Sequence, residues 1–236
     1  MNRFKPFAVA LPALLLFGCG NPADNVPKAD VSSSTNTGAV AAASDPAPAG
    51  SKTYVFGPET STIDFVGSKV TGSHKGGFKK FAGELHAANG RLAGSGNKVV
   101  IDMDSLWADN DRLTGHLKSP DFFNTAQIPT ATFVSKSISD QGTNSLVTGD
   151  LTLHGVTKQI SFPATIKVTD SQVDVAADFA INRFDFDIKY PGKANDLIRK
   201  EVVLKLNVKA APGKADFQSI QKTVQVERPL PAVAVR

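Results

Sequence analysis

The chain has 236 residues, of which 41% are hydrophobic and 20% are charged, with 26 basic and 22 acidic side chains. The two signs of charge are interspersed without a basic stripe, which argues against a nucleic-acid partner. Cys19 is the only cysteine, so an internal disulfide is excluded.

Residues 1–18 are predicted to be a lipoprotein signal peptide. Arg3 and Lys5 form a short basic region, and the apolar run that follows is shorter than the roughly 20 residues that cross a bilayer as a helix. The run ends in Leu-Phe-Gly-Cys at 16–19, which resembles a bacterial lipobox with Cys19 as the lipidated residue. An ordinary signal peptide followed by an unrelated cysteine is the alternative.

The lipobox resemblance implies a lipoprotein of the cell envelope that faces the periplasm. Gly20 follows the cysteine, in place of the aspartate associated with inner-membrane retention, so the outer membrane is favoured over the inner membrane. Residues 19–51 are predicted to be the acylated cysteine and a disordered tether. This stretch is rich in Ala, Ser, Asn, Asp and Pro, and it buries too little apolar surface to offset the entropy of ordering.

Residues 52–211 are long enough for one hydrophobic core, and most of the stretch alternates between apolar and polar residues. The clearest alternation predicts strands at 156–168, 173–181 and 202–208. Weaker runs predict strands at 53–57, 61–70, 76–85, 98–104, 131–138 and 145–153. Only 111–119 has helical spacing. The pattern predicts an antiparallel all-β protein, and it leaves open whether the sheet is a sandwich or a closed barrel. Residues 212–236 are predicted to be a C-terminal tail.

The segment NDRLTGHLKSPDFFN at 110–124 resembles the signature of the YceI-like, polyisoprenoid-binding family. Four further blocks match the pattern of the same family in the same order. They contain His74, Gly77, Phe78, Phe81 and Gly83; residues 128–133; residues 149–157; and Ile181, Asn182, Arg183, Asp185 and Phe186. Asp187 departs from the pattern, because the family usually has glycine there.

The resemblance implies an extended, lipocalin-like barrel of eight antiparallel strands with one short helical segment and an apolar tunnel. It also implies that the protein binds and sequesters or carries an amphiphilic isoprenoid-type lipid, such as a quinone or a polyprenyl phosphate. Each methylene of a long tail contributes about 0.8 kcal/mol when buried. The residues predicted to line the tail site are Phe65, Phe78, Phe81, Met103, Trp107, Phe122, Phe123, Phe133, Phe179 and Ile181. Any of them could instead fill a solid core.

The polar head group needs cations or hydrogen-bond donors. The candidates are Arg112, His116, Lys118, Arg183 and Tyr190. A phosphate favours the arginines, whereas a quinone needs only a donor such as His116 or Tyr190. Structural ion pairs are the alternative for the arginines, Arg183 with Asp185 or Asp187 and Arg112 with Asp109 or Asp111.

The four histidines lack the spacing of metal ligands, so no metal site and no cofactor are predicted, although His74 and His116 could meet in space. An enzyme is not predicted, because no nucleophile elbow or Ser-His-Asp motif is present. Asp102 and Asp104 could be imagined as catalytic carboxylates, but they alternate with apolar residues, which places both on the solvent face of a strand. The alternative function is an envelope stress or interaction lipoprotein without a hydrophobic ligand, and a homodimer is a further possible assembly.

Overall fold

The structure is a computed structural model that describes residues 20–33, 50–218 and 220. Cys19, the predicted signal peptide and residues 221–236 lie outside the described residues. Within the described ranges, no helix combines the length and hydrophobicity required to span a membrane.

Strands make up most of the described chain. They are β1 (Asp30–Ser33), β2 (Lys52–Phe56), β3 (Thr62–Lys69), β4 (Gly72–Phe78), β5 (Phe81–Ala88), β6 (Arg91–Leu92), β7 (Lys98–Asp102), β8 (Leu106–Ala108), β9 (Thr130–Gln141), β10 (Asn144–Leu153), β11 (Val156–Val168), β12 (Val173–Asn182), β13 (Gly192–Lys193) and β14 (Asp196–Pro212). The helical elements are the α-helix α1 (Asp111–Lys118) and the 3-10 turns η1 (Pro22–Asn25), η2 (Met103–Ser105) and η3 (Arg183–Phe186).

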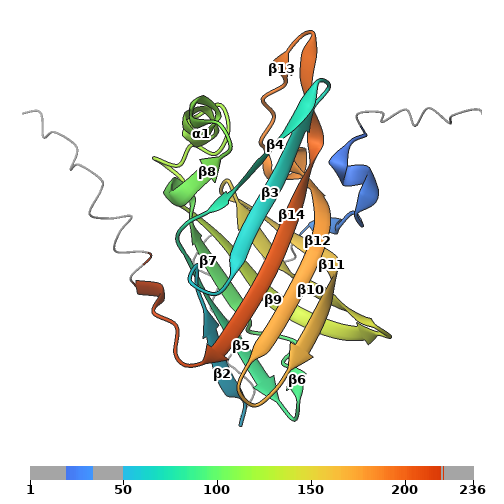
Figure 1. Cartoon of the computed structure of the whole chain (residues 1–236), viewed down its shortest axis with the longest axis vertical. Helices are drawn as coiled ribbons and strands as arrows, with labels where there is room; N and C mark the ends of the chain where they lie inside the picture. The colour runs from blue at the N-terminus through green and yellow to red at the C-terminus, as the bar shows by residue number, and fades with distance from the viewer. Residues whose placement is uncertain (1–19, 34–49, 219, 221–236) are drawn as a thin grey trace, which may run out of the picture.

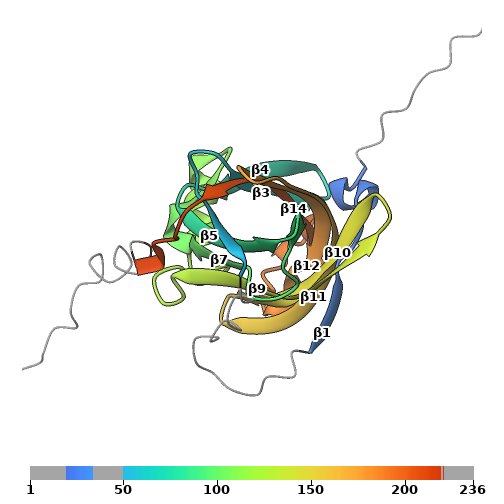
Figure 2. The ribbon, with the colours of Figure 1, turned by 90° about the horizontal axis from the view of Figure 1, so that it is seen from below.

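Eight strands close into an antiparallel barrel in the order β2, β5, β7, β9, β10, β11, β12, β14 and back to β2. Figure 2 shows the closed ring of strands from below. The predicted all-β class, the eight-stranded antiparallel barrel and the short helical segment are therefore confirmed. The strands predicted at 156–168 and 173–181 match β11 and β12 closely, because period-two alternation is strongest there.

One end of the barrel is extended by β3, β4 and β8, which continue the sheet from the first half of β14 (Figure 1). Gly76 permits this extension, since a Cβ there would lie 2.3 Å from the ring of Phe65 and 2.3 Å from the carbonyl oxygen of Trp107. Helix α1 follows β8 at the same end. Asn110 caps the helix by accepting a hydrogen bond from the Leu113 amide at 3.0 Å.

Side chains on the inner faces form two apolar clusters. The upper cluster lies toward the end with α1 and includes Phe162, Phe179 and Phe186. The lower cluster lies toward β2 and includes Tyr54, Phe56 and Phe81. Rings stack between strands in the upper cluster, with centroids 4.1 Å apart for Phe162 and Phe179. The inner face of the barrel is therefore apolar along its length.

The predicted disordered tether is wrong for residues 20–33, which fold onto the barrel. Strand β1 pairs antiparallel with β11, with Val31 opposite Ile160. On the other side, the Ala29 amide donates to the Ala180 carbonyl at 2.8 Å, and the Ala180 amide donates to Pro27 at 2.8 Å. This segment therefore bridges β11 and β12 where these two strands no longer pair with each other.

Backbone hydrogen bonds and side-chain contacts both hold the segment. Ala23 is 1% exposed and packs against Val66, Ala180 and Val203 on the outside of the barrel. A composition rich in small and polar residues predicted disorder. It could not reveal that the barrel wall supplies unpaired strand edges for this segment. Residues 34–49 of the predicted tether lie outside the described residues.

Replacing Ala23 with glutamate tests this docking. We expect Ala23→Glu to lower the free energy of unfolding by about 2–3 kcal/mol, because a carboxylate would be buried against aliphatic side chains without a partner. The measurement is urea denaturation of the full-length chain, and Ser32→Glu on the exposed side of β1 is the control. Equal unfolding midpoints for the two variants would contradict the docking and support the predicted disordered tether.

Candidate lipid-binding site

Most residues predicted to line a lipid tail lie in the two interior clusters. Phe65, Phe122, Phe179 and Ile181 are buried members of the upper cluster, and Phe78, Phe123 and Phe133 pack partly buried against it. Phe81 is buried in the lower cluster, and Phe78 contacts that cluster as well. The structure therefore gathers eight of the ten candidates in or against the two apolar clusters, and their contact with a lipid stays a prediction.

Trp107 does not share the inner face, so the prediction of its position is wrong. Leu106 and Ala108 on the same strand β8 belong to the upper cluster, and alternation turns Trp107 to the opposite side. Gly77 pairs with Trp107 in the sheet, and a Cβ there would lie 3.1 Å from its indole Nε1. Met103 is buried in η2 but belongs to neither interior cluster.

An aromatic group joins the upper cluster to polar atoms. His116 of α1 meets the edge of Phe122 with ring centroids 5.0 Å apart, and it meets Tyr190 at 4.9 Å. Phe122 and Tyr190 are 5.1 Å apart. The imidazole Nε2 of His116 lies 3.1 Å from a carboxylate oxygen of Asp121. Two predicted head-group residues, His116 and Tyr190, therefore lie beside a predicted tail residue, Phe122. This group has an apolar side toward the upper cluster and a polar side toward Asp121.

Arg183 has a structural position. It is 4% exposed, and its guanidinium donates hydrogen bonds only to backbone carbonyls among the described partners. The Nε donates to Arg199 at 3.1 Å, Nη1 donates to Ile188 at 2.6 Å, and Nη2 donates to Tyr190 at 2.8 Å and Ile198 at 3.3 Å. Burial lowers the pKa of Arg183. These bonds fix the segment that carries Tyr190, so we assign Arg183 a positioning role.

The neighbouring aspartates pair elsewhere, which corrects the alternative of an ion pair with Arg183. Asp187 pairs with Lys189 at 2.5 Å, and this hydrogen bond lowers the pKa of Asp187. Asp185 accepts a hydrogen bond from Asn182 at 3.5 Å. Asp187 has φ 61° and ψ 18°, a left-handed conformation that favours glycine and that aspartate tolerates. The departure from the glycine of the family pattern therefore leaves this turn intact.

The two remaining head-group candidates are farther toward the solvent. Arg112 is exposed on α1, and Lys118 lies 3.5 Å from Asp104. Asp109 pairs with His74 at 2.8 Å, not with Arg112, and accepts a hydrogen bond from the Lys75 amide. This amide, followed by His74, lowers the pKa of Asp109.

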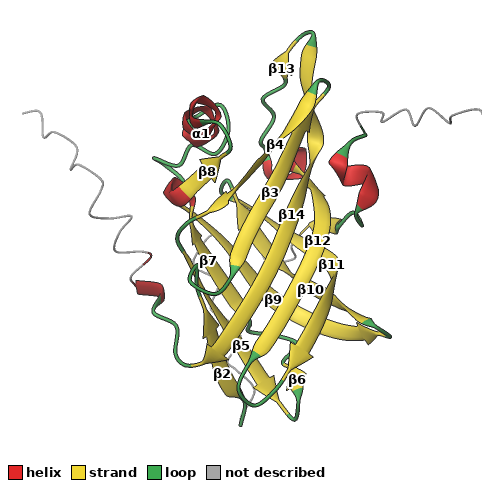
Figure 3. Cartoon of the chain, viewed as in Figure 1, coloured by secondary structure: helices red, strands yellow, loops and turns green. Residues whose placement is uncertain are grey.

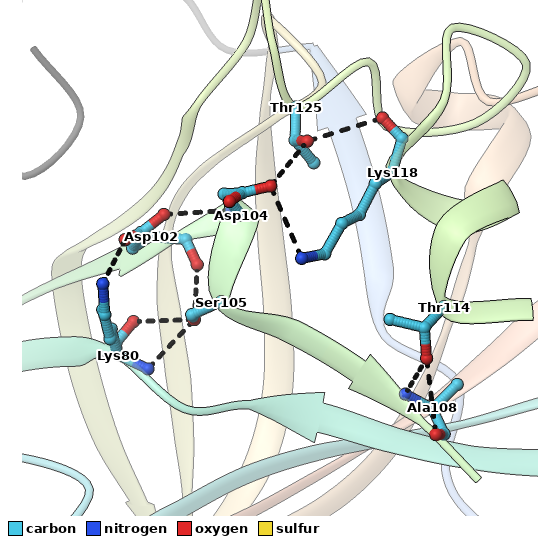
Figure 4. A network of polar contacts seen from close by, with 8 residues as sticks. All are labelled: Lys80, Asp102, Asp104, Ser105, Ala108, Thr114, Lys118 and Thr125. Carbon is cyan, nitrogen blue, oxygen red and sulfur yellow. Dashed lines mark hydrogen bonds and ion pairs between the residues drawn. The ribbon is translucent and has the colours of Figure 1, made fainter. Parts of the chain in front are cut away.

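A polar pocket of about 390 Å³ lies between β8 and α1 (Figure 4). Its lining residues are Lys79, Lys80, Asp102, Asp104, Ser105, Leu106, Trp107, Ala108, Asp111, Thr114 and Lys118. The Lys80 amide donates to Ser105 at 2.9 Å, and the Ala108 amide donates to Thr114 at 2.9 Å. Sequence patterns did not predict this pocket, because its polar groups come from three separate segments, 79–80, 102–108 and 111–118, although the adjacent Lys79 and Lys80 are a visible signal.

The structure contradicts the predicted solvent-facing position of Asp102. It is 3% exposed, and its carboxylate accepts the Asp104 amide at 2.9 Å as the cap of η2. The strand ends there and the chain turns, so the alternation that predicted exposure no longer applies. Lys80 lies 4.0 Å from this carboxylate. The described residues contain no group of three or more His, Cys, Asp or Glu side chains arranged to hold a metal ion.

The closed eight-stranded sheet with an apolar inner face places the chain in the class of lipocalin-like barrels, whose bore suits one slender ligand. Residues 54–210 match the family model of the YceI-like domain. The chain belongs to the YceI-like family.

Relatives share part of this sequence. A UPF0312 protein of Pseudomonas putida is 32% identical over 134 residues, which cover 54% of this chain and 70% of the relative. A UPF0312 protein of Vibrio vulnificus is 41% identical over 91 residues, which cover 38% of this chain and 48% of the relative.

Two solved structures share the fold. Burkholderia cenocepacia BcnA has a TM-score of 0.60 at 24% identity, covering 66% of this chain and 99% of BcnA. A polyisoprenoid-binding domain of Saccharophagus degradans has a TM-score of 0.55 at 19% identity, covering 69% of this chain and 99% of that domain.

The positioning role of Arg183 predicts a large effect of a conservative change. Arg183→Lys should lower the free energy of unfolding by about 2–4 kcal/mol, because an ammonium cannot reach all four carbonyls that the planar guanidinium satisfies. Chemical denaturation provides the measurement. Arg112→Lys on the exposed face of α1 is the matched control, and equal stability of the two variants would refute the positioning role.

Proposed function

We propose that the barrel binds one amphiphilic isoprenoid-type lipid and sequesters or carries it in the bacterial cell envelope. The tail lies among the interior apolar side chains, and the head lies at the end with His116 and Tyr190. The observation that carries the proposal is the contact of these two polar rings with Phe122, a buried member of the upper cluster. The Saccharophagus degradans neighbour is itself a polyisoprenoid-binding domain.

The hydrophobic effect supplies the affinity in this proposal. A tail of about fifteen buried carbons, at about 0.8 kcal/mol each, offsets an association cost of several kcal/mol. No bond of the ligand has to be made or broken, so the role requires no catalytic group. Binding depends instead on whether the interior side chains separate to admit a chain.

The donors near the aromatic group favour a quinone over a polyprenyl phosphate as the head. Arg183 directs its hydrogen bonds to carbonyls, and Lys118 lies near Asp104, so neither is set to grip a phosphate. The Tyr190 hydroxyl and the His116 imidazole suit the carbonyl oxygen of a quinone ring, which needs one or two donors.

We further propose that Cys19 is acylated and that the protein faces the periplasm from the outer membrane. The lipobox-like sequence and Gly20 support this location. An attachment of several acyl chains is stable, whereas one chain holds a protein only marginally.

A substitution inside the barrel tests tail binding. Residues 19–236 with Cys19→Ser retain every described residue, and they are incubated with membrane lipids and separated from free lipid before bound isoprenoid is measured by mass spectrometry. Phe133→Asp should reduce bound lipid at least about tenfold, because a carboxylate would enter the apolar path. Phe133→Leu should retain binding, and Lys167→Gln on the outer face of β11 should have no effect. Equal loss in all three variants would contradict an interior site.

The head-group position is tested by removing one hydroxyl. Tyr190→Phe should weaken quinone binding about fivefold, the worth of one hydrogen bond of about 1 kcal/mol. Tyr54→Phe is the control, since the Tyr54 hydroxyl donates to Thr169 at 2.9 Å in the lower part of the barrel. Titration calorimetry with a short-chain quinone gives both affinities. An unchanged affinity in Tyr190→Phe would contradict the proposed position of the head group.

A further inference from the structure

The large apolar side chains that are exposed in the described chain gather at one end of the barrel. They are Val70, Leu197 and Phe184, with 56%, 50% and 41% of their surfaces exposed. The Val70 amide donates to the Leu197 carbonyl at 3.2 Å, so the β3–β4 turn lies beside the start of β14. Exposed apolar groups scattered singly need no explanation, whereas a cluster marks an interaction surface.

Phe184 belongs to the same end. It lies on η3, near the base of the β13–β14 hairpin in Figure 3. The adjacent Arg183 donates to the carbonyls of Ile198 and Arg199 on β14 and lies over the Phe184 ring, with its guanidinium carbon 4.7 Å from the centroid. The ring is therefore held in place although its outer face is exposed.

Asp196 fastens the two hairpins that carry Val70 and Leu197. Its carboxylate accepts hydrogen bonds from the amide of Thr71 at 3.2 Å and from the hydroxyl of Thr71 at 2.9 Å, and it forms an ion pair with Lys69. The two hairpins thus form one preformed tip, and binding through it requires little ordering of the backbone.

Around the tip, lysines without an ion pair outnumber such carboxylates among the described residues, although Asp185 beside Phe184 accepts only a hydrogen bond from Asn182. Asp187 and Glu201 are each paired with a lysine, as Asp196 is. Lys193 on β13 and Lys200 on β14 are exposed, and neither has an ion pair with any residue of the described ranges. Cations beside exposed apolar groups match the surface of a bilayer that contains anionic lipid.

The N-terminal segment reaches the same end. The described chain begins at Gly20, and the side-chain oxygen of Asn21 accepts a hydrogen bond from the hydroxyl of Ser68 at 3.2 Å. Ser68 is on β3, two residues before Val70 in the β3–β4 turn. Consecutive Cα atoms are about 3.8 Å apart. Cys19, the proposed acylation site, directly precedes Gly20 in the sequence, so acylation there would attach lipid to the segment that contacts the tip.

We propose that Val70, Leu197 and Phe184, with Lys193 and Lys200, form a docking tip that inserts into the surface of an anionic bilayer. The tip and the lipid anchor then contact the same membrane at the same end of the barrel. This orients the long axis of the barrel away from the membrane surface. The lower end, with β2 and the β11–β12 turn, faces away from the bilayer (Figure 1). Docking concerns the outer surface, so it does not depend on what the barrel holds.

Vesicle binding without the acyl chains tests the docking tip. Residues 19–236 with Cys19→Ser are sedimented with vesicles of phosphatidylglycerol and phosphatidylethanolamine, and with vesicles of phosphatidylcholine. We expect binding to the anionic vesicles, and about tenfold weaker binding for Leu197→Asn, which removes one inserted side chain. Lys193→Gln with Lys200→Gln should weaken binding to anionic vesicles only.

Matched controls lie away from the tip. Ser171→Asn is in the exposed β11–β12 turn at the lower end, and Lys167→Gln is on the outer face of β11; neither should change sedimentation. Failure of the parent to bind anionic vesicles, or equal binding of parent and Leu197→Asn, would overturn the proposal. A dimer of the parent that dissociates in Leu197→Asn, seen by analytical ultracentrifugation, would also overturn it, because a second copy would then cover the tip. Loss of lipid cargo with vesicle binding intact would refute only the proposed function.

Discussion

Closure of the sheet through β14 is the constraint on which the rest of the structure depends. This strand pairs with β12 along one edge, from Ala210 opposite Val173 to Glu201 opposite Asn182. On its other edge it pairs with β3 and then with β2. Once the sheet is closed, alternate residues of every barrel strand face a common interior. Apolar residues at these positions form an inner surface that a sandwich would bury against a second sheet.

The closed barrel also determines where polar groups can act. Burying an unpaired polar group in the apolar interior costs free energy. The candidate polar residues of the site therefore lie at the end where α1, η3 and the residues after them meet. His116 and Tyr190 come from segments far apart in sequence and contact the same buried ring of Phe122. Arg183 makes this arrangement possible by satisfying carbonyls of two segments, and thus one buried cation orders the region beside the candidate site without itself facing a ligand.

Period-two alternation predicted the strands well where one face is buried and the other exposed, as in β11 and β12. It failed where a strand ends or a local turn begins. Asp102 is buried because η2 starts there. Trp107 faces outward because Leu106 and Ala108, its neighbours on the short strand β8, belong to the upper cluster. Residues 20–33 were missed for another reason, since their order comes from strand edges supplied by distant residues. The motif at 110–124 located the polar end of the candidate site, whereas the carbonyl partners of Arg183 depend on tertiary structure that no local pattern encodes.

The central claim is that the interior opens to hold one lipid tail. Native mass spectrometry of residues 19–236 with Cys19→Ser, expressed in a bacterial periplasm and purified without detergent, tests it most directly. We expect a complex of one chain with one isoprenoid amphiphile, which dissociates on collisional activation and is identified from its released mass. A chain of ligand-free mass, both as purified and after incubation with membrane lipids, would contradict a lipid-binding barrel and indicate a solid interaction module with the same fold.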